Sequence, residues 1–142
     1  MYQFVIPIHH VNWSTRSVLE GISQKYKPKQ IYVVTSDHEI KIFKDKSNSW
    51  DIENLTLLDE DNFFLNKYGL TKKDIVSQIT QNKPNYSPGW LYQQIIKLGA
   101  SDVIDELEDV FIIWDADLLP VKSWPILDLS LIHISEPTRP LS

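Results

Sequence analysis

The chain has 142 residues, of which 42% are hydrophobic and 23% are charged, so it is long enough for one domain and is not disordered as a whole. A net charge of −5 at pH 7 argues against a non-specific nucleic-acid binder, and the lack of cysteine excludes disulfides and thiolate zinc sites within this chain. No apolar run approaches the roughly 20 residues of a membrane-spanning helix, and the first residues lack the features of a secretion signal, so we expect a cytoplasmic protein without a transmembrane segment.

The start of the chain has the pattern of a strand, a helix and a second strand. Residues 2–8 (YQFVIPI) form an apolar run typical of a buried strand, and residues 30–35 (QIYVVT) are rich in β-branched side chains. Between them, residues 14–26 carry apolar side chains at helical spacing, with Ser14 as the expected N-cap. This order predicts a right-handed parallel strand–helix–strand unit.

The middle of the chain predicts shorter elements. Ser36 and Glu39 have the spacing of a capping box, which introduces a short helix or a turn. Residues 54–58 fit a short strand, and residues 71–79 fit a helix that is capped by Thr71.

The clearest helix follows a loop. Residues 81–89 (QNKPNYSPG) contain two prolines and other turn-forming residues, so we expect a loop there. Residues 89–100 (GWLYQQIIKLGA) predict a helix that ends at Gly99, because glycine is common where helices stop. The apolar stripe expected on this helix consists of Leu91, Ile95 and Leu98.

An apolar run then leads into two aspartates. Residues 110–114 (VFIIW) have no polar member and predict a strand buried on both faces. Asp115 and Asp117 follow, and we expect them to point the same way because strand residues two apart share a face. Two neighbouring carboxylates repel each other unless a cation lies between them, and hard divalent cations prefer such ligands. The alternating elements predict a three-layer α/β sheet that binds ligands at the carboxyl ends of its strands.

The end of the chain is not typical of natural protein. Residues 129–139 (LSLIHISEPTR) resemble the translation of a transposase adapter used in sequencing libraries. We therefore expect residues 1–128 to be the N-terminal portion of a longer domain and residues 129–142 to be a non-native tail. An amphipathic strand with a proline-rich end is the simpler alternative.

Three motifs occur in an order that resembles a known family. They are a Pro-Ile-His turn after the first strand at residues 7–9, a Gly-Trp-x-x-Gln-Gln helix at residues 89–94, and Asp-x-Asp at residues 115–117. Over most of residues 2–120 they resemble bacterial glycosyltransferase-like proteins of the GT-A superfamily, which use nucleotide-diphosphate sugars. The resemblance implies a three-layer α/β/α, Rossmann-like GT-A sheet, incomplete at its C-terminal end. It also implies that residues 1–128 are the N-terminal nucleotide-sugar-binding portion of that domain.

The resemblance also implies a metal and a donor. Asp115 and Asp117 would hold Mn²⁺ or Mg²⁺ against the two phosphates of a UDP- or GDP-linked sugar. A bound cation suits this chemistry, because the leaving diphosphate gains negative charge as the glycosidic bond breaks. The acceptor and the catalytic base stay unassigned, because the chain ends soon after the metal motif.

Five further residues would line the donor site by the same resemblance. Pro7 and His9 would lie near the base and ribose, and Asp37 after the second strand would contact the nucleotide. Gln93 and Gln94 would face the cleft and offer their amides to sugar hydroxyls.

Simpler interpretations compete for most of these residues. Aspartates are common in turns after strands, and glutamines are common on the polar face of a helix. His9 and His10 are adjacent, so in an extended segment at most one would face the cleft. Helix capping is the favoured explanation for Asp37, and a place in the core or the cleft wall is the favoured explanation for Trp90 and Trp114.

Two other functions fit parts of the sequence. A phosphatase resembling the haloacid dehalogenase superfamily would use Asp115 as nucleophile and Asp117 as general acid. That motif normally opens its domain, whereas here two strands and several helices are expected before it. A non-enzymatic sugar- or nucleotide-binding module, or a degenerate enzyme fragment, is the third alternative.

Overall fold

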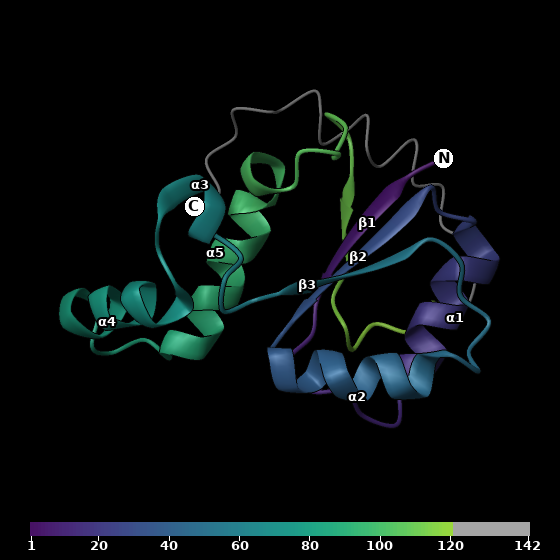
Figure 1. The fold of residues 1–142 in the computed structure, drawn as a ribbon, viewed down its shortest axis with the longest axis horizontal. Coiled ribbons are helices and arrows are strands. Elements are labelled where there is room, and N and C mark those ends of the chain that lie inside the picture. The colour runs from purple at the N-terminus through teal and green to yellow at the C-terminus, as the bar shows by residue number, and fades with distance from the viewer. Residues whose placement is uncertain (121–142) are drawn as a thin grey trace.

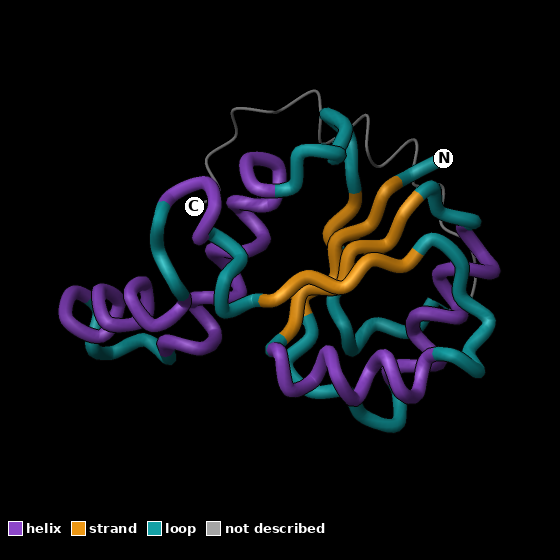
Figure 2. Tube along the Cα trace, viewed as in Figure 1, coloured by secondary structure: helices purple, strands orange, loops and turns teal. Residues whose placement is uncertain are grey.

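The computed structural model of the chain describes residues 1–120, in which parallel strands alternate with helices (Figures 1 and 2). The elements in chain order are β1 Gln3–Pro7, α1 Thr15–Tyr26, β2 Gln30–Thr35, α2 Asp37–Ser47, β3 Leu55–Asp59, α3 Leu65–Tyr68, α4 Lys72–Asn82, α5 Pro88–Val103 and β4 Ile112–Ile113. Within this part of the chain, no helix combines the length and the apolar character needed to cross a membrane.

The strands form one parallel sheet in the order β3-β2-β1-β4. β1 lies inside the sheet, where Ile6 is opposite Val33 of β2 and Phe4 is opposite Ile112 of β4. The predicted α/β class and the parallel strand–helix–strand unit at the start of the chain are therefore confirmed.

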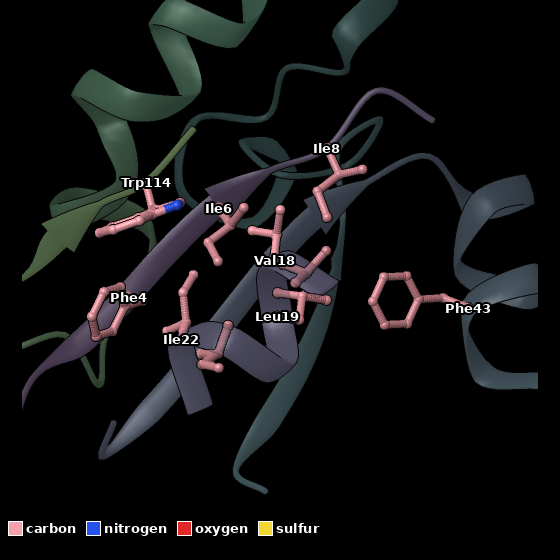
Figure 3. Packing of buried hydrophobic residues seen from close by; sticks show 10 residues of the cluster. Phe4, Ile6, Ile8, Val18, Leu19, Ile22, Phe43 and Trp114 are labelled. Carbon is pink, nitrogen blue, oxygen red and sulfur yellow. The ribbon is translucent and has the colours of Figure 1, made fainter. Parts of the chain in front are cut away.

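Helices cover both faces of the sheet, with α1 and α2 on one side and α5 on the other (Figure 1). Alternate side chains of the strands divide between two buried clusters, as expected where both faces are covered. The cluster under α1 and α2 contains Phe4, Ile6, Ile8, Val18, Leu19, Ile22, Ile31, Val33, Phe43 and Trp114 (Figure 3). The cluster under α5 contains Val5, Tyr32, Val34, Phe63, Phe64, Tyr92, Ile96, Ala100 and Ile104.

Several predicted elements agree with the structure to within a few residues. The strands expected over residues 2–8, 30–35 and 54–58 correspond to β1, β2 and β3, and the helix expected over residues 14–26 corresponds to α1. α4 begins after Thr71 as predicted, and Thr71 and Asp74 form a complete capping box. The loop expected over residues 81–89 is shorter, because α4 continues to Asn82 and α5 begins at Pro88.

α2 differs from the short helix or turn that the sequence predicts, because it extends over 11 residues. The Ser36 hydroxyl accepts a hydrogen bond from the Glu39 backbone N–H at 3.3 Å, which is half of the expected capping box. The other half is replaced, because the buried Glu39 carboxylate bonds to the loop after β1. The local pattern thus predicts the start of this helix but not its length.

α5 corrects two predictions. The helix continues through Gly99 to Val103, so Gly99 is not its end. Leu98 of the predicted apolar stripe is 63% exposed, and the side chains buried against the sheet are instead Tyr92, Ile96 and Ala100. Glycine at position 99 has a packing role, because a Cβ there would lie 2.7 Å from the Phe64 ring.

β4 is shorter and more exposed than the buried strand that the sequence predicts. It contains only Ile112 and Ile113, and Ile113 is 40% exposed. In the described part of the chain β4 is an edge strand paired with β1 alone, which explains its incomplete burial. Trp114, directly after it, is buried. The expected boundary at residue 128 and the adapter-like tail over residues 129–142 lie outside the described residues.

Candidate functional site

A cleft of about 750 Å³ lies at the carboxyl ends of β1 and β4. Its walls come from the loop after β1, from α5 between Trp90 and Lys97, and from the turn after β4. From β1 the chain builds the sheet outward through β2 to β3, and then returns to add β4 on the other side of β1. The cleft therefore lies where the strand order reverses, which is the usual ligand site of an open parallel sheet.

Asp115 and Asp117 both line this cleft, but strand alternation does not place them there. The strand ends at Ile113, and the two aspartates lie in a turn in which the Leu118 N–H donates to the Asp115 carbonyl at 3.0 Å. Both side chains are exposed to solvent. The predicted juxtaposition at a cleft is found, and its predicted cause is wrong.

Trp114 fixes this turn to the core. Its backbone N–H donates to the Val5 carbonyl at 3.0 Å, which extends the β1–β4 ladder by one residue. Its indole Nε1–H donates to the Leu118 carbonyl at 2.6 Å, and its ring packs against Phe4 and Tyr26. Because one side chain belongs to both the core and the turn, the aspartates are held at a defined place on the sheet.

α5 presents one face to the cleft and a neighbouring face to the sheet. Trp90, Gln93, Gln94 and Lys97 line the cleft, at the spacing expected for residues on one side of a helix. Gln93 and Gln94, which were expected to face the cleft, line it together with the aspartates. Trp90 is 55% exposed at the cleft wall, so it does not belong to the core.

The sheet-facing side of α5 is anchored by Tyr92. Its buried hydroxyl donates to the Glu60 carbonyl after β3. Burial, followed by the negative charge of Glu60, raises the pKa of Tyr92, so the hydroxyl stays protonated and keeps donating. This bond helps to set the position of α5 relative to the sheet.

A lysine supplies positive charge beside the aspartates. The Lys97 Nζ lies 3.0 Å from Oδ1 of Asp115, and the two side chains are 23% and 70% exposed. Asp117 has no such partner within residues 1–120. A side chain from α5 therefore offsets part of the negative charge of the two aspartates.

The loop after β1 forms another wall of the cleft. Pro7, His9 and His10 all line the cleft, and the two imidazole rings lie 4.1 Å apart between centroids. The expectation that only one histidine faces the cleft is wrong, because the chain bends here and is not extended. Glu39 holds this bend by accepting from the Val11 N–H at 3.0 Å, and its carboxylate lies 3.3 Å from Nδ1 of His10.

The start of α1 completes this wall with Asn12 and Thr15. Asn12 Oδ1 accepts from both the backbone N–H and the hydroxyl of Ser14, at 3.0 and 2.7 Å. The Thr15 hydroxyl accepts from the Asn12 N–H at 2.9 Å. Ser14 occupies the predicted N-cap position without a side-chain capping bond, so the asparagine organises the turn into α1 instead.

Asp37 is not among the residues that line the cleft. It is the first residue of α2, its side chain is 63% exposed, and it forms a surface ion pair with Lys41 one turn later. Its interactions are those of a residue in the first turn of a helix. The structure therefore separates Asp37 from the other predicted site residues.

Residues 16–133 match the model of a family of unknown function (DUF6492). The chain belongs to this family. No curated protein and no solved structure matches it. The matched region includes α5, the two aspartates and most of α1, so the family's sequence pattern covers two of the three walls of the cleft. It begins after the loop that carries the two histidines.

The carboxylates in the cleft could hold a hard cation whose remaining ligands come from a substrate. Within residues 1–120 there is no group of three or more metal-ligating side chains that could enclose a metal ion. Mg²⁺ is often held by only one or two carboxylates together with substrate phosphates and water. Asp115 and Asp117 fit that arrangement, in which the phosphates complete the coordination.

Several residues of the cleft were not expected from the sequence. Lys97 lies on the same face of α5 as Gln93, four residues away, so helical spacing could have found it. Asn12 and Thr15 carried a weaker signal, since asparagine and threonine are common at helix starts for structural reasons alone. No local pattern indicates the bond from Glu39 to Val11, because 28 residues separate its partners.

Proposed function

We propose that this chain is the donor-binding part of a metal-dependent glycosyltransferase that uses a nucleotide-diphosphate sugar. The proposal includes a GT-A-like sheet, Mn²⁺ or Mg²⁺ at Asp115 and Asp117, and a UDP- or GDP-linked donor. The cytoplasmic location expected from the sequence is part of the same proposal.

One observation carries the proposal. The Asp-x-Asp turn, the Gln-Gln face of α5 and the Pro-Ile-His loop are far apart in the sequence, yet all three line one cleft. These are the motifs on which the resemblance to GT-A proteins rests. Their convergence at the carboxyl ends of β1 and β4 is the arrangement that a shared ligand site requires.

The charges in the cleft suit a diphosphate leaving group. In the proposed reaction the bond between the anomeric carbon and a phosphate oxygen breaks, and its electron pair stays on the diphosphate. The acceptor hydroxyl forms the new bond to carbon and loses its proton. A cation bound at the aspartates would supply positive charge to the diphosphate, and Lys97 lies beside Asp115.

The other walls suit the uncharged parts of the donor. Gln93 and Gln94 are half-buried at the cleft and carry both donors and acceptors for sugar hydroxyls. The exposed ring of Trp90 at the same wall offers an apolar surface for a sugar or a base. The acceptor site and the catalytic base are not assigned to any residue.

The test is calorimetric measurement of UDP and GDP binding to the whole chain, with and without Mn²⁺. We expect one nucleotide to bind only when Mn²⁺ is present. The double variant Asp115→Asn with Asp117→Asn should weaken this binding by about 100-fold or more, because it removes both carboxylate ligands.

The matched control is Asp37→Asn with Asp45→Asn. It removes the same charge from exposed positions of α2 outside the cleft, so nucleotide affinity should stay within about twofold of the wild type. Absence of nucleotide binding by a chain with a normal far-UV spectrum would overturn the proposal. Trapping of beryllofluoride at Asp115 without any nucleotide would favour the phosphatase instead.

A further inference from the structure

Lys97 has a distinctive place in the cleft. It is the only lysine or arginine among the described residues that line the cleft. Its side chain is only 23% exposed, and its Nζ lies 3.0 Å from Oδ1 of Asp115. The pair joins α5 to the turn after β4 across 18 positions of the sequence.

We propose that Lys97 is a diphosphate-binding residue that changes partner when the ligand binds. Without ligand, its ammonium group neutralises Asp115. When a divalent cation and a nucleoside diphosphate occupy the cleft, the ammonium group bonds to a phosphate oxygen instead. This inference rests on the proposed function, and it adds a residue and a step that the resemblance does not supply.

The first reason to expect this exchange is that the metal ion and Lys97 compete for the Asp115 carboxylate. A carboxylate that ligates a divalent cation gives up most of its attraction for a second positive charge. The ammonium group of Lys97 would then lie, largely shielded from water, beside a metal ion of like charge. An unpaired cation in such a place is unfavourable, so it will bond to the nearest strong acceptor. The phosphates that complete the metal's coordination are that acceptor.

The second reason to expect this exchange is the length and flexibility of the Lys97 side chain. Lysine has a flexible stem and three rotatable N–H donors, so a small rotation can exchange one oxygen partner for another. The exposed fraction of Asp115, 70%, also shows that this carboxylate is open to the cleft and accessible to a ligand. Neither partner has to leave the cleft for the exchange.

A purely structural role makes a different prediction. If Lys97 only ties α5 to the turn after β4, its loss should lower the stability of the fold and lower the affinity for every ligand of the site alike. The proposed exchange instead gives opposite effects on two ligands. Removing Lys97 frees Asp115 for the metal alone, and it deprives the diphosphate of a contact.

The experiment compares the wild type with Lys97→Met, which keeps the length and apolar stem of the side chain. Calorimetry measures the affinity for Mn²⁺ alone, and then for UDP and GDP at saturating Mn²⁺. We expect Lys97→Met to bind Mn²⁺ alone about threefold more tightly, as expected for release of one partly exposed ion pair. We expect it to bind the nucleotide about 10- to 100-fold more weakly, as for loss of one hydrogen bond to a charged group.

Two further variants complete the design. Lys97→Arg keeps the positive charge and should retain nucleotide affinity to within about fivefold. Lys41→Met removes a lysine that pairs with Asp37 on the surface of α2, at 3.4 Å and 76% exposed, and should change neither affinity. Far-UV spectra and thermal midpoints establish that each variant is folded. If Lys97→Met is not folded, Lys97→Gln takes its place, with the same expectations.

The outcomes separate the two proposals. Unchanged nucleotide affinity in a folded Lys97→Met would overturn this inference and leave the proposed function intact. An equal loss of affinity for Mn²⁺ and for nucleotide, with a lower thermal midpoint, would also overturn it in favour of a structural role. If the wild type binds neither UDP nor GDP in the presence of Mn²⁺, the proposed function fails and this inference fails with it.

Discussion

Glu39 shows how one buried carboxylate can shape a site that it does not line. It lies in the first turn of α2 and is 6% exposed. Its carboxylate accepts from the Val11 N–H and lies beside His10, so it links the start of α2 to the loop that carries the histidines. A backbone N–H in a bend has few other partners, and leaving it unpaired is costly where water has little access.

Replacing this carboxylate should therefore affect both the fold and the cleft. We expect Glu39→Ala to lower the free energy of unfolding by about 1.5–3 kcal/mol, because it removes a charged acceptor from a backbone donor. Glu39→Gln keeps an acceptor and should lose about half as much. Urea denaturation measures both changes.

The control for Glu39→Ala is Asp37→Ala, two residues away on the same helix. Its ion pair with Lys41 lies on the surface, so the loss should be about 0.5 kcal/mol or less. Equal losses for Glu39→Ala and Asp37→Ala would show that the contact with Val11 adds nothing to stability.

At the scale of the element, α5 depends on the contact between Gly99 and Phe64. The two lie close enough that a Cβ on Gly99 would meet the ring at 2.7 Å. The ring is 5% exposed and packs against Phe63, Tyr68 and Tyr92, so it has little room to move. The absence of a side chain thus lets α5 approach the segment between β3 and α3.

Two glycines of α5 allow a matched comparison. Gly99→Ala gains about 1 kcal/mol in helix propensity and loses about 1–3 kcal/mol through overpacking, so we expect a net destabilisation of about 1 kcal/mol. Gly89→Ala meets nothing within 4 Å and should stabilise the fold by up to about 1 kcal/mol. Thermal and urea denaturation measure both values, and stabilisation by both substitutions would contradict the packing role of Gly99.

At the scale of the whole molecule, the sheet connects the core with the cleft. β1 lies between β2 and β4, contributes to both hydrophobic clusters and ends at the cleft. Trp114 makes the same connection within one residue, because its ring is in the core and its indole N–H holds the turn of the aspartates.

Substitutions of Trp114 should separate these two roles. Trp114→Ala should lower stability by about 3–5 kcal/mol, because it removes a large buried side chain. Trp114→Phe keeps an aromatic ring and should lower stability less. It also removes the donor to the Leu118 carbonyl, so it should weaken metal-dependent nucleotide binding by about tenfold.

Trp13→Ala is the control for this comparison. Its side chain is 92% exposed, so neither stability nor binding should change measurably. Full nucleotide affinity in Trp114→Phe would show that the indole bond does not position the aspartates. Denaturation curves and calorimetry supply the two measurements.

The sequence by itself determined the elements whose signals are local. The β-branched run of β2 and the N-cap of α4 at Thr71 were predicted correctly, because both depend on residues close together in the chain. Gln93 and Gln94 of α5 and the two aspartates of the turn were selected from short motifs, and all four line one cleft in the structure. The alternation of apolar runs with helical patterns was enough to predict an α/β sheet.

Only the tertiary structure decided the features that depend on distant partners. From the sequence, Gly99 predicts the end of a helix, whereas in the structure this glycine lies within α5 and packs against Phe64. The sequence also predicts a strand buried on both faces at β4, whereas the structure places β4 at the edge of the sheet. The pairing of Lys97 with Asp115 was likewise not predicted from the sequence. Each of these depends on the free energy of a contact between segments far apart in the chain, and a local pattern carries no information about which segments meet.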